Sequence, residues 1–313
     1  MEILNEVLSP PGSLEIQVSS LFSHVSTGTE LLYFKGLVPE DCFADLNLVG
    51  LTENKGYPVS YGYAVVGTVT SLGTEVTDFK LHDLVFCFHS HGDLFNYPAS
   101  HALALPPGLD PIDGVFLAQM ETALNLVLDL APLVGERIKV FGLGNLGILC
   151  ALILKNFPLG LLGVEDPRKS RNALAKDLGL FPGGKGPWDG VLEISGSPEA
   201  FNQAVDELDF SGRLVLGSWY GNKPGHLNLG GNFHRKRLKI QGSQVSTLSP
   251  GLTGLWDKQR LRNLALEWLK KIKPSRFVTH KFTLSQGQQA YELLSDPDSN
   301  VGSLVFIYSN DLT

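Results

Sequence analysis

A glycine-rich segment at 142–147 lies between two apolar runs and limits the folds open to this chain. The run at 138–141 predicts a strand and the run at 148–154 predicts a helix, so the segment is a strand–turn–helix junction. At such a junction the pyrophosphate of a dinucleotide binds against the amino end of the helix, because glycines permit a tight turn, close backbone approach and close packing. The predicted contacts of this turn are Gly142, Gly144, Asn145, Leu146 and Gly147.

An acid follows the turn at the spacing that a ribose site requires. Asp166 comes about twenty residues after the turn, behind a second strand-like run at 160–164. A carboxylate there accepts hydrogen bonds from the adenosine ribose hydroxyls, which favours NAD over NADP. The basic residues just beyond it keep NADP as the alternative; they are Arg168, Lys169 and Arg171. A purely structural turn is the competing interpretation, because short glycine motifs are common.

Length and charge exclude several classes of protein. The 313 residues suffice for two domains of ordinary size. A net charge of -7 and the lack of a basic stripe argue against nucleic-acid binding. No apolar run approaches the roughly twenty residues of a membrane span, and the N-terminus has no secretory pattern, so we expect a cytoplasmic protein without a membrane partner. The cysteines are too scattered for a disulfide framework or a zinc knuckle.

Two patterns of hydrophobicity divide the chain. Before about Met120, short runs such as 14–18, 64–69 and 83–87 predict a β-barrel-like domain. After it, strands and helices alternate, which predicts a mostly parallel sheet with helices on both faces. The strands expected there are 138–141, 161–164, 190–194, 213–217 and 238–241, and the helices include 169–178 and 198–208. The tail predicts helices at 257–271 and 285–294 and strands at 276–282 and 302–308, which we expect to pack on the first domain.

Several ordered motifs resemble the medium-chain dehydrogenase/reductase superfamily and its zinc-type alcohol dehydrogenases. They are Ser26–Glu30, Gly62–Val69 continuing into Leu72–Lys80, the glycine turn, and Asp166. The resemblance covers nearly the whole chain. It implies an α/β protein with a split GroES-like catalytic domain at 1–122 and 245–313 and a doubly wound Rossmann domain at 123–244 that binds NAD(P). It also implies a small-molecule substrate, a cleft between the domains, and a homodimer or homotetramer.

Other residues hold the positions of the family's catalytic zinc ligands. In the zinc alcohol dehydrogenases these positions carry cysteine, histidine and a further cysteine or glutamate; by the resemblance they are Thr27, Tyr63 and Ala118 here. None supplies the thiolate, imidazole or carboxylate that zinc requires. The four-cysteine structural lobe is absent too, so we expect no zinc. The segments around Thr27 and Tyr63 also partly resemble bacteriochlorophyllide dehydrogenases, in which a tyrosine likewise replaces the zinc histidine.

Without a metal, side chains must polarise the carbonyl and move the proton that accompanies hydride transfer. By the resemblance, Thr29 holds the position of a proton-relay hydroxyl, although it could instead bond only a turn backbone. Tyr63 stands where the zinc histidine would be, and its phenol could donate a hydrogen bond to a substrate oxygen. The alternative is that Tyr63 only fills the space left by the metal.

Two more residues are candidates for acid–base chemistry. His91 follows a predicted strand, and imidazole titrates near neutral pH. A solvated loop histidine, or a metal pair with His89, is the alternative. Glu121 is an acid among apolar residues. A buried carboxyl group can act as a proton donor or anchor an Arg or Lys, whereas a carboxylate at a helix N-terminus is the competing explanation.

Further cofactor contacts are expected at the carboxyl edge of the predicted parallel sheet, where this fold binds its ligands. Ser195 and Gly196 follow one predicted strand, and Trp219 follows the next. By the resemblance, Thr122 lies close to the nicotinamide and Gln244 approaches its carboxamide.

Together these features favour an NAD(H)-dependent, zinc-independent oxidoreductase that interconverts a carbonyl and an alcohol. The nearest alternative is an NAD(P)H-dependent enone or quinone reductase, because zinc-free members of the superfamily often reduce activated double bonds. A catalytically silent nucleotide-binding sensor is the alternative from another class.

Overall fold

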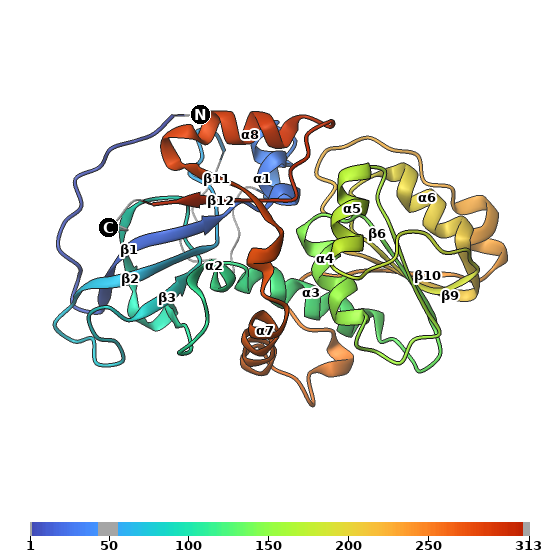
Figure 1. Cartoon of the computed structure of the whole chain (residues 1–313), viewed down its shortest axis with the longest axis horizontal. Coiled ribbons are helices and arrows are strands. Elements are labelled where there is room, and N and C mark those ends of the chain that lie inside the picture. Colours follow the sequence, from blue (N-terminus) through green and yellow to red (C-terminus); the bar gives the residue numbers. More distant parts are fainter. Residues whose placement is uncertain (1, 43–55, 309–313) are drawn as a thin grey trace. The chain divides into compact units, whose positions relative to one another are not determined.

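The structure is a computed structural model that describes residues 2–42 and 56–308 (Figure 1). The chain forms two compact units, the first of Met1–Ala118 and Leu269–Thr313 and the second of Gln119–Trp268. The helices α3 (Leu117–Leu130) and α7 (Lys258–Ile272) each run through a limit between the units. The domain limits expected at 122/123 and 244/245 stay a prediction.

The first unit is built on a seven-stranded sheet in the order β11–β12–β1–β2–β3–β5, with β4 also paired to β1. Its strands are β1 (Glu15–His24), β2 (Val65–Leu72), β3 (Leu84–Cys87), β4 (Leu94–Pro98), β5 (Leu103–Ala104), β11 (Val278–Thr283) and β12 (Ser303–Ile307). The pairs are antiparallel except β11–β12. Its helical segments are α1 (Thr27–Phe34), η1 (Glu40–Cys42), η2 (Ala99–His101), α2 (Pro111–Gly114), η5 (Pro274–Phe277), η6 (Leu284–Gln286) and α8 (Gly287–Ser295).

The core of this unit follows from alternation along its strands. Ile16 and Val18 of β1 are fully buried, and Val18 lies opposite the buried Val69 of β2. Because alternate side chains of a strand point to the same face of the sheet, Ile16, Val18 and Val69 belong to one apolar layer. The C-terminal tail joins the same sheet, since Phe22 of β1 pairs with Ile307 of β12. The last part of the tail, Leu269–Thr313, belongs to the first unit, whereas residues 245–268 belong to the second.

The second unit contains a parallel five-stranded sheet in the order β10–β9–β8–β6–β7. The strands are β6 (Arg137–Phe141), β7 (Leu161–Glu165), β8 (Trp188–Glu193), β9 (Leu208–Leu216) and β10 (Lys239–Gly242). Its other helical segments are α4 (Asn145–Leu154), α5 (Lys169–Asp177), α6 (Pro198–Glu207), η3 (Leu229–Phe233) and η4 (Pro250–Leu252). This is the alternating strand–helix order that the sequence predicts for a doubly wound domain.

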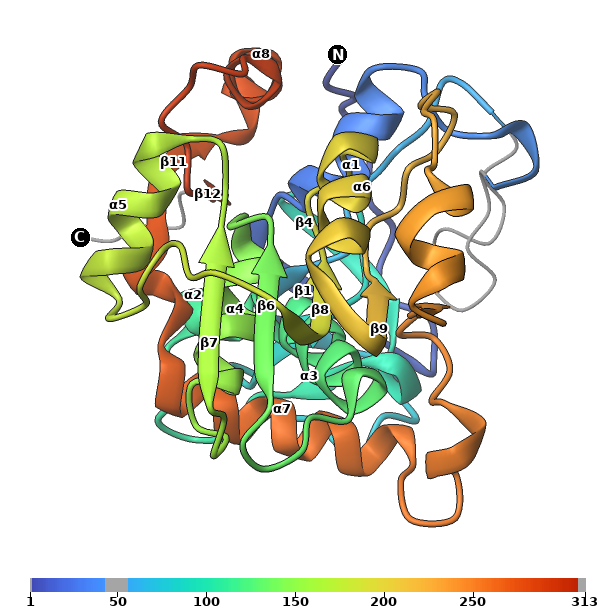
Figure 2. The ribbon, with the colours of Figure 1, turned by 90° about the vertical axis from the view of Figure 1, so that its right-hand side faces the viewer.

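The strand order reverses beside β6. The next strand in the chain, β7, lies on one side of β6, and β8 lies on the other. Parallel α/β sheets bind their ligands at the carboxyl ends of the strands beside such a reversal. Figure 2 shows the arrowheads of β6, β7, β8 and β9 at one edge of the sheet. Both the glycine turn, which follows β6, and Ser195, which follows β8, lie at this edge.

A lysine is buried in the strand β6 of this sheet. Lys139 is 1% exposed, and its Nζ lies 2.6 Å from a carboxylate oxygen of Glu165 and of Glu207. An ammonium group so placed needs these partners, because an unpaired buried charge is strongly unfavourable. The Trp188 ring occupies the same region, and a Cβ on Gly163 of β7 would lie 2.5 Å from it. Gly163 therefore makes room for the indole.

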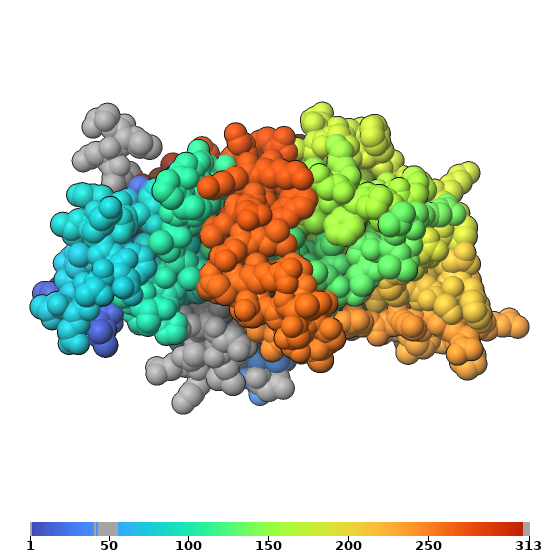
Figure 3. Space-filling model, turned by 90° about the horizontal axis from the view of Figure 1, so that it is seen from below, coloured from blue at the N-terminus to red at the C-terminus, as the bar shows by residue number. Residues whose placement is uncertain are grey.

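Most predicted elements are confirmed to within a few residues, including α5, α7, β11 and β12. The helix α1 and the strand β4 were not predicted from the sequence. The chain around residue 260, which belongs to α7, lies at the surface in Figure 3. Within residues 2–42 and 56–308, no helix has both the length and the apolar character needed to cross a membrane.

Candidate functional site

The fold itself requires two glycines of the turn between β6 and α4. Gly142 has a φ of +95°, and a Cβ there would lie 2.7 Å from the Cα of Ser195. A Cβ on Gly147 would lie 1.8 Å from the carbonyl oxygen of Gly142. Any larger residue at either position would therefore displace the backbone of the turn.

Gly144 differs, because the packing of the chain does not require a glycine there. Its φ of -70° suits any residue, and the nearest heavy atom to a Cβ built on it is Arg171 Nη1, 3.9 Å away. Gly144 also caps α4, whose first N–H groups have no partner within the helix. In a turn of this kind the second glycine lets the backbone approach a pyrophosphate closely, which is a reason for glycine other than packing.

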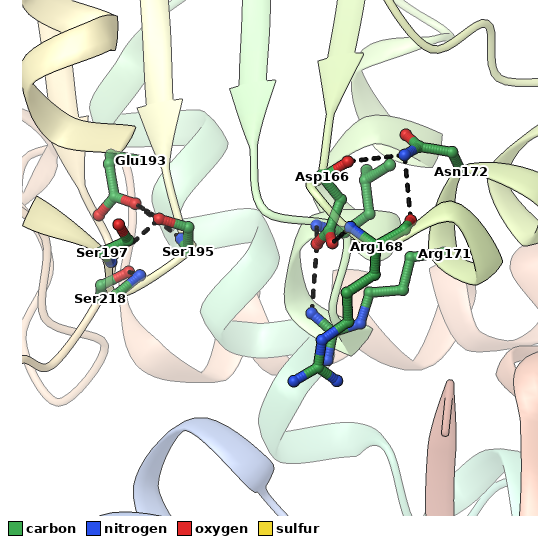
Figure 4. A network of polar contacts seen from close by, with 10 residues as sticks. Asp166, Arg168, Arg171, Asn172, Glu193, Ser195, Ser197 and Ser218 are labelled. Carbon is green, nitrogen blue, oxygen red and sulfur yellow. Dashed lines mark hydrogen bonds and ion pairs between the residues drawn. The ribbon is translucent and has the colours of Figure 1, made fainter. Parts of the chain in front are cut away.

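Asp166 fastens the glycine turn to the end of β7. Its Oδ2 accepts hydrogen bonds from Leu143 N at 2.8 Å and from Arg171 Nη1 at 3.2 Å, and its Oδ1 accepts one from Arg168 N at 2.9 Å. Figure 4 shows this cluster, in which Asn172 also donates to the Asp166 carbonyl oxygen at 2.6 Å. A carboxylate offers about four acceptor positions, so Oδ1 keeps one for a ribose hydroxyl. The ribose contact itself stays a prediction.

Ser195 and Gly196 follow β8, and a Cβ on Gly142 would lie 2.7 Å from the Cα of Ser195. The left side of Figure 4 shows Ser195 with Glu193, Ser197 and Ser218. Glu193, the last residue of β8, is fully buried and accepts hydrogen bonds from Ser195 N at 2.7 Å, from Ser195 Oγ, and from the Tyr220 hydroxyl at 3.0 Å. Gly196 has a φ of +67°, and its N–H donates to Ser218 Oγ at 2.8 Å. Sequence reasoning missed Glu193, although an acid at the end of an apolar strand was a visible signal.

The predicted nicotinamide contacts belong to the same unit. Ser243, beside Gln244, receives a hydrogen bond on its Oγ from Asn125 Nδ2 at 3.1 Å. Asn125 is three residues after Thr122 on α3, so the two share a helix face. The exposed Gln244 accepts a hydrogen bond from Ser246 N. Trp219, the remaining candidate, is 36% exposed and follows Ser218.

Glu121 makes the anchoring contact that the sequence offered as one alternative. It is 3% exposed, and its carboxylate accepts a hydrogen bond from Arg262 Nε at 3.0 Å, with Lys258 Nζ at 3.8 Å. Lys258 Nζ also donates to the Val245 carbonyl oxygen at 2.7 Å. Burial lowers the pKa of Lys258, although the charge of Glu121 opposes this. Glu121 thus ties α3 to α7, and it lies inside α3, which begins at Leu117, rather than at its first residue.

In the first unit, Tyr63 lies against the start of α1. Its hydroxyl donates to Ser26 Oγ, and Ser26 is the residue before α1. The neighbouring Gly62 has a φ of +114°, and a Cβ there would lie 2.8 Å from the His91 ring. Thr29, half-buried on α1, donates its backbone N–H to the Ser26 carbonyl oxygen at 3.0 Å. The fold therefore brings Thr29, Tyr63 and His91 into one neighbourhood.

A buried carboxylate that sequence reasoning missed lies at the centre of this neighbourhood. Glu30 accepts hydrogen bonds from Ser26 N at 2.6 Å, from His91 Nε2 at 2.9 Å, and from the Tyr291 hydroxyl. Its side chain is 1% exposed. The only signal in the sequence was its place at the end of the Ser26–Glu30 motif.

The environment of Glu30 keeps it ionised. Burial by itself raises the pKa of this carboxyl group, but His91, Tyr291 and the Ser26 N–H together hold it below its ordinary value of 4.5. An ionised carboxylate only accepts hydrogen bonds, so the proton between the two groups resides on His91 Nε2. The other ring nitrogen, Nδ1, lies 2.7 Å from Ser23 Oγ, which in turn lies 2.8 Å from the Tyr308 hydroxyl.

The structure contradicts the alternative that His91 is a solvated loop residue. Its side chain is 6% exposed, and both ring nitrogens have partners. It is not paired with His89 on a metal either, because the His89 ring stacks on Phe95 with a centroid distance of 3.8 Å. The burial of His91 could not be predicted from its place in a loop, because its partners Ser23 and Glu30 lie on β1 and α1, far away in the sequence.

Across residues 2–42 and 56–308, no group of three or more His, Cys, Asp or Glu side chains is arranged to hold a metal. By the resemblance, the positions of the zinc ligands are those of Thr27, Tyr63 and Ala118, and this correspondence stays a prediction. The donor set of these residues does not suit zinc, which prefers thiolate, imidazole or carboxylate ligands.

The comparisons with known proteins agree on one group of enzymes. No family model matches the chain. L-threonine 3-dehydrogenase of Cronobacter sakazakii is 23% identical over 289 residues, which covers 77% of this chain and 81% of that protein. Among solved structures, one from Sinorhizobium meliloti 1021, described as a zinc-binding dehydrogenase and bound to NADP, has a TM-score of 0.73 at 17% identity and covers 96% of this chain and 93% of its own. An Escherichia coli CFT073 alcohol dehydrogenase complexed with NADH has a TM-score of 0.75 at 16% identity, covering 98% and 96%.

The resemblance to the medium-chain dehydrogenase/reductase superfamily is confirmed. The same comparisons confirm the expected fold class of a GroES-like and a Rossmann part, and they agree with an NAD(P)-dependent oxidoreductase of this superfamily. They leave the substrate and the metal content of this chain open.

Proposed function

We propose that this protein is an NAD(H)-dependent, zinc-independent oxidoreductase that interconverts a carbonyl and an alcohol. One observation carries most of the proposal. The glycine turn lies at the reversal of the strand order, and the packing of the chain would allow a larger residue at its second glycine, Gly144. A ligand that approaches the backbone closely supplies a reason for glycine at this position.

The nucleotide would be held by residues at one edge of the parallel sheet. Backbone N–H groups at the start of α4 receive the pyrophosphate, and the open acceptor position of Asp166 receives a ribose hydroxyl. The remaining proposed contacts are Thr122, Ser195, Gly196, Trp219 and Gln244. When bound, a nicotinamide supplies or accepts the hydride. The charge of Asp166 favours NAD, because a 2′-phosphate would be repelled by it.

The proton would be supplied in the first unit. Tyr63 is half-buried and carries a hydroxyl, so its phenol can donate a proton to a substrate oxygen as hydride reaches the adjacent carbon. Thr29 on α1 is the second hydroxyl of this neighbourhood. His91 is enclosed by Glu30 and Ser23, and we assign it to the support of the site rather than to direct contact with substrate. Glu121 makes its contacts with α7 and is the least suited of the four candidates.

Nucleotide binding is the first test. Isothermal titration calorimetry of the purified chain with NADH and with NADPH should give a micromolar dissociation constant for NADH and weaker binding of NADPH. A panel of carbonyls and secondary alcohols, including benzaldehyde, acetophenone and L-threonine, is then assayed for nicotinamide absorbance changes. Lack of binding of either nucleotide at millimolar concentration would refute the proposal. Reduction of enones alone would favour the reductase alternative, and binding without turnover would favour the sensor.

A further inference from the structure

Ser26 makes two contacts that converge on the proposed proton donor. Its Oγ accepts the hydrogen bond of the Tyr63 hydroxyl, and its backbone N–H donates to Glu30 Oε1 at 2.6 Å. Ser26 is 7% exposed and precedes α1, yet its side chain makes no capping hydrogen bond to the helix. The hydroxyl therefore serves Tyr63 rather than the end of the helix.

Glu30 cannot shift without breaking contacts with two distant segments and with the start of its own helix. His91 comes from the loop after β3, Tyr291 from α8, and Ser26 immediately precedes α1, and all three donate to its buried carboxylate. A carboxylate so enclosed fixes the Ser26 backbone, and with it the direction of the Ser26 hydroxyl. Rigid support of this kind is what a group needs to keep a productive geometry.

We propose that Ser26 and Glu30 are positioning residues for the Tyr63 phenol. Glu30 holds the Ser26 backbone, and the Ser26 hydroxyl holds the phenol. It accepts the phenol's hydrogen bond at rest, and it donates to the phenol oxygen once the phenolic O–H turns to the substrate oxygen. This inference rests on the proposed function. In the reducing direction, the Tyr63 O–H bond breaks and its proton goes to the substrate oxygen, while the hydride that forms the new C–H bond would come from a bound reduced nicotinamide. The phenolate then accepts a hydrogen bond from Ser26 until solvent returns a proton.

Serine suits this part because a hydroxyl both donates and accepts hydrogen bonds. It accepts from the phenol at rest and donates to the phenolate after transfer. Alanine can do neither, whereas threonine can do both. An aspartate at this place would accept only and would repel the phenolate.

The test compares five variants in the full-length chain: Ser26→Ala, Ser26→Thr, Glu30→Gln, Tyr63→Phe and the double variant Ser26→Ala/Tyr63→Phe. Ser303→Ala is the matched control, because Ser303 is another buried serine of the first unit, and its Oγ contacts His24 rather than Tyr63. The first readout needs no ligand: the Cζ resonance of Tyr63 in chain labelled with ¹³C-tyrosine, assigned by its loss in Tyr63→Phe. The second is turnover of the best carbonyl of the panel above.

We expect Ser26→Ala to move the Tyr63 resonance and to lower kcat about 10- to 100-fold, with KM and the NADH dissociation constant within about twofold of wild type. Ser26→Thr should recover most of the loss, and the double variant should be no slower than Tyr63→Phe, because the two groups act as one unit. Glu30→Gln should also move the Tyr63 resonance. Both carboxylate oxygens of Glu30 accept hydrogen bonds, whereas an amide has only one oxygen that can accept.

Two results would overturn the inference alone. One is an unmoved Tyr63 resonance in Ser26→Ala, and the other is a kcat of Ser26→Ala equal to that of Ser303→Ala while Tyr63→Phe is impaired. Full turnover by Tyr63→Phe would remove both the tyrosine assignment and the inference. Lack of NADH and NADPH binding by the wild-type chain would refute the proposed function, and this inference with it.

Discussion

Two buried carboxylates, Glu30 and Glu193, organise the candidate site residues of their units. Glu30 gathers the neighbourhood of Tyr63 and His91, and Glu193 fixes Ser195 beside the glycine turn. An ionised carboxylate is unfavourable in a protein interior unless donors surround it, so each of these residues fixes the positions of its partners. Neither role could be predicted locally, because Tyr291 lies 261 residues from Glu30 in the sequence.

His24 gives a prediction at the residue scale. It is 1% exposed at the end of β1, and burial, with a smaller contribution from His91 and against that of Glu30, lowers its pKa from 6.5 to about 3. Between these values the unfolded chain binds a proton that the folded chain excludes, so stability falls as pH falls from 6.5 toward 3. Over the window from pH 6.5 to 5, where Glu30 remains ionised, the loss should be roughly 2 kcal/mol.

Urea unfolding of wild type and of His24→Gln at several pH values between 5 and 7 measures this dependence. The slope of the unfolding free energy against pH should be smaller for His24→Gln than for wild type. His226→Gln is the control, because His226 is exposed. Equal slopes for wild type and His24→Gln would show that His24 does not carry the proton linkage.

At the scale of elements, the junction of β6 and α4 contains two kinds of glycine. Gly142 and Gly147 are required by the packing of the fold, whereas Gly144 is proposed to be required by a ligand. Gly147→Ala places a Cβ 1.8 Å from the Gly142 carbonyl oxygen, so we expect loss of several kcal/mol or failure to fold. Gly144→Ala places its Cβ at least 3.9 Å from every other group, so the unfolding midpoint should change little. Binding of NADH by Gly144→Ala should weaken at least tenfold, because the methyl group occupies the approach to α4.

Thermal melts and NADH titrations of the two variants, with Gly230→Ala as an open-space control, test this contrast. Wild-type nucleotide affinity in Gly144→Ala would contradict the placement of the pyrophosphate. A normally stable Gly147→Ala variant would contradict the account of the turn.

Elements that depend on tertiary partners were the ones missed from the sequence. The helix α1 contains Gly28 and threonines, which are poor helix formers, and Glu30 supports its start through Ser26. The strand β4 is five residues long and ends in proline, and it is held by its register against β1, where Phe95 lies opposite Val18. Local propensity gives little indication of either element.

At the scale of the whole molecule, the chain shares its fold with a solved structure described as a zinc-binding dehydrogenase, whereas Thr27, Tyr63 and Ala118 are the residues that the resemblance assigns to the zinc positions. We predict that purified protein contains far less than one zinc per chain and that a chelator leaves its thermal midpoint unchanged. Zinc ligands would have to be thiolate, imidazole or carboxylate, and these positions offer none. Elemental analysis by mass spectrometry checks the first part, and stoichiometric zinc that survives dialysis would refute it.

The sequence by itself determined the strand–turn–helix junction, the alternation of the second unit, and the return of the tail to the first sheet. These are set by hydrophobic period and by glycine geometry, which act over a few neighbouring residues. Only the tertiary structure decided that His91 is buried, that Asp166 binds the glycine turn, and that Glu30 unites Ser26, His91 and Tyr291. These contacts depend on which side chains, far apart in the sequence, lie beside a buried charge. The free-energy cost of leaving such a charge unpaired arises only when the folded chain removes it from water.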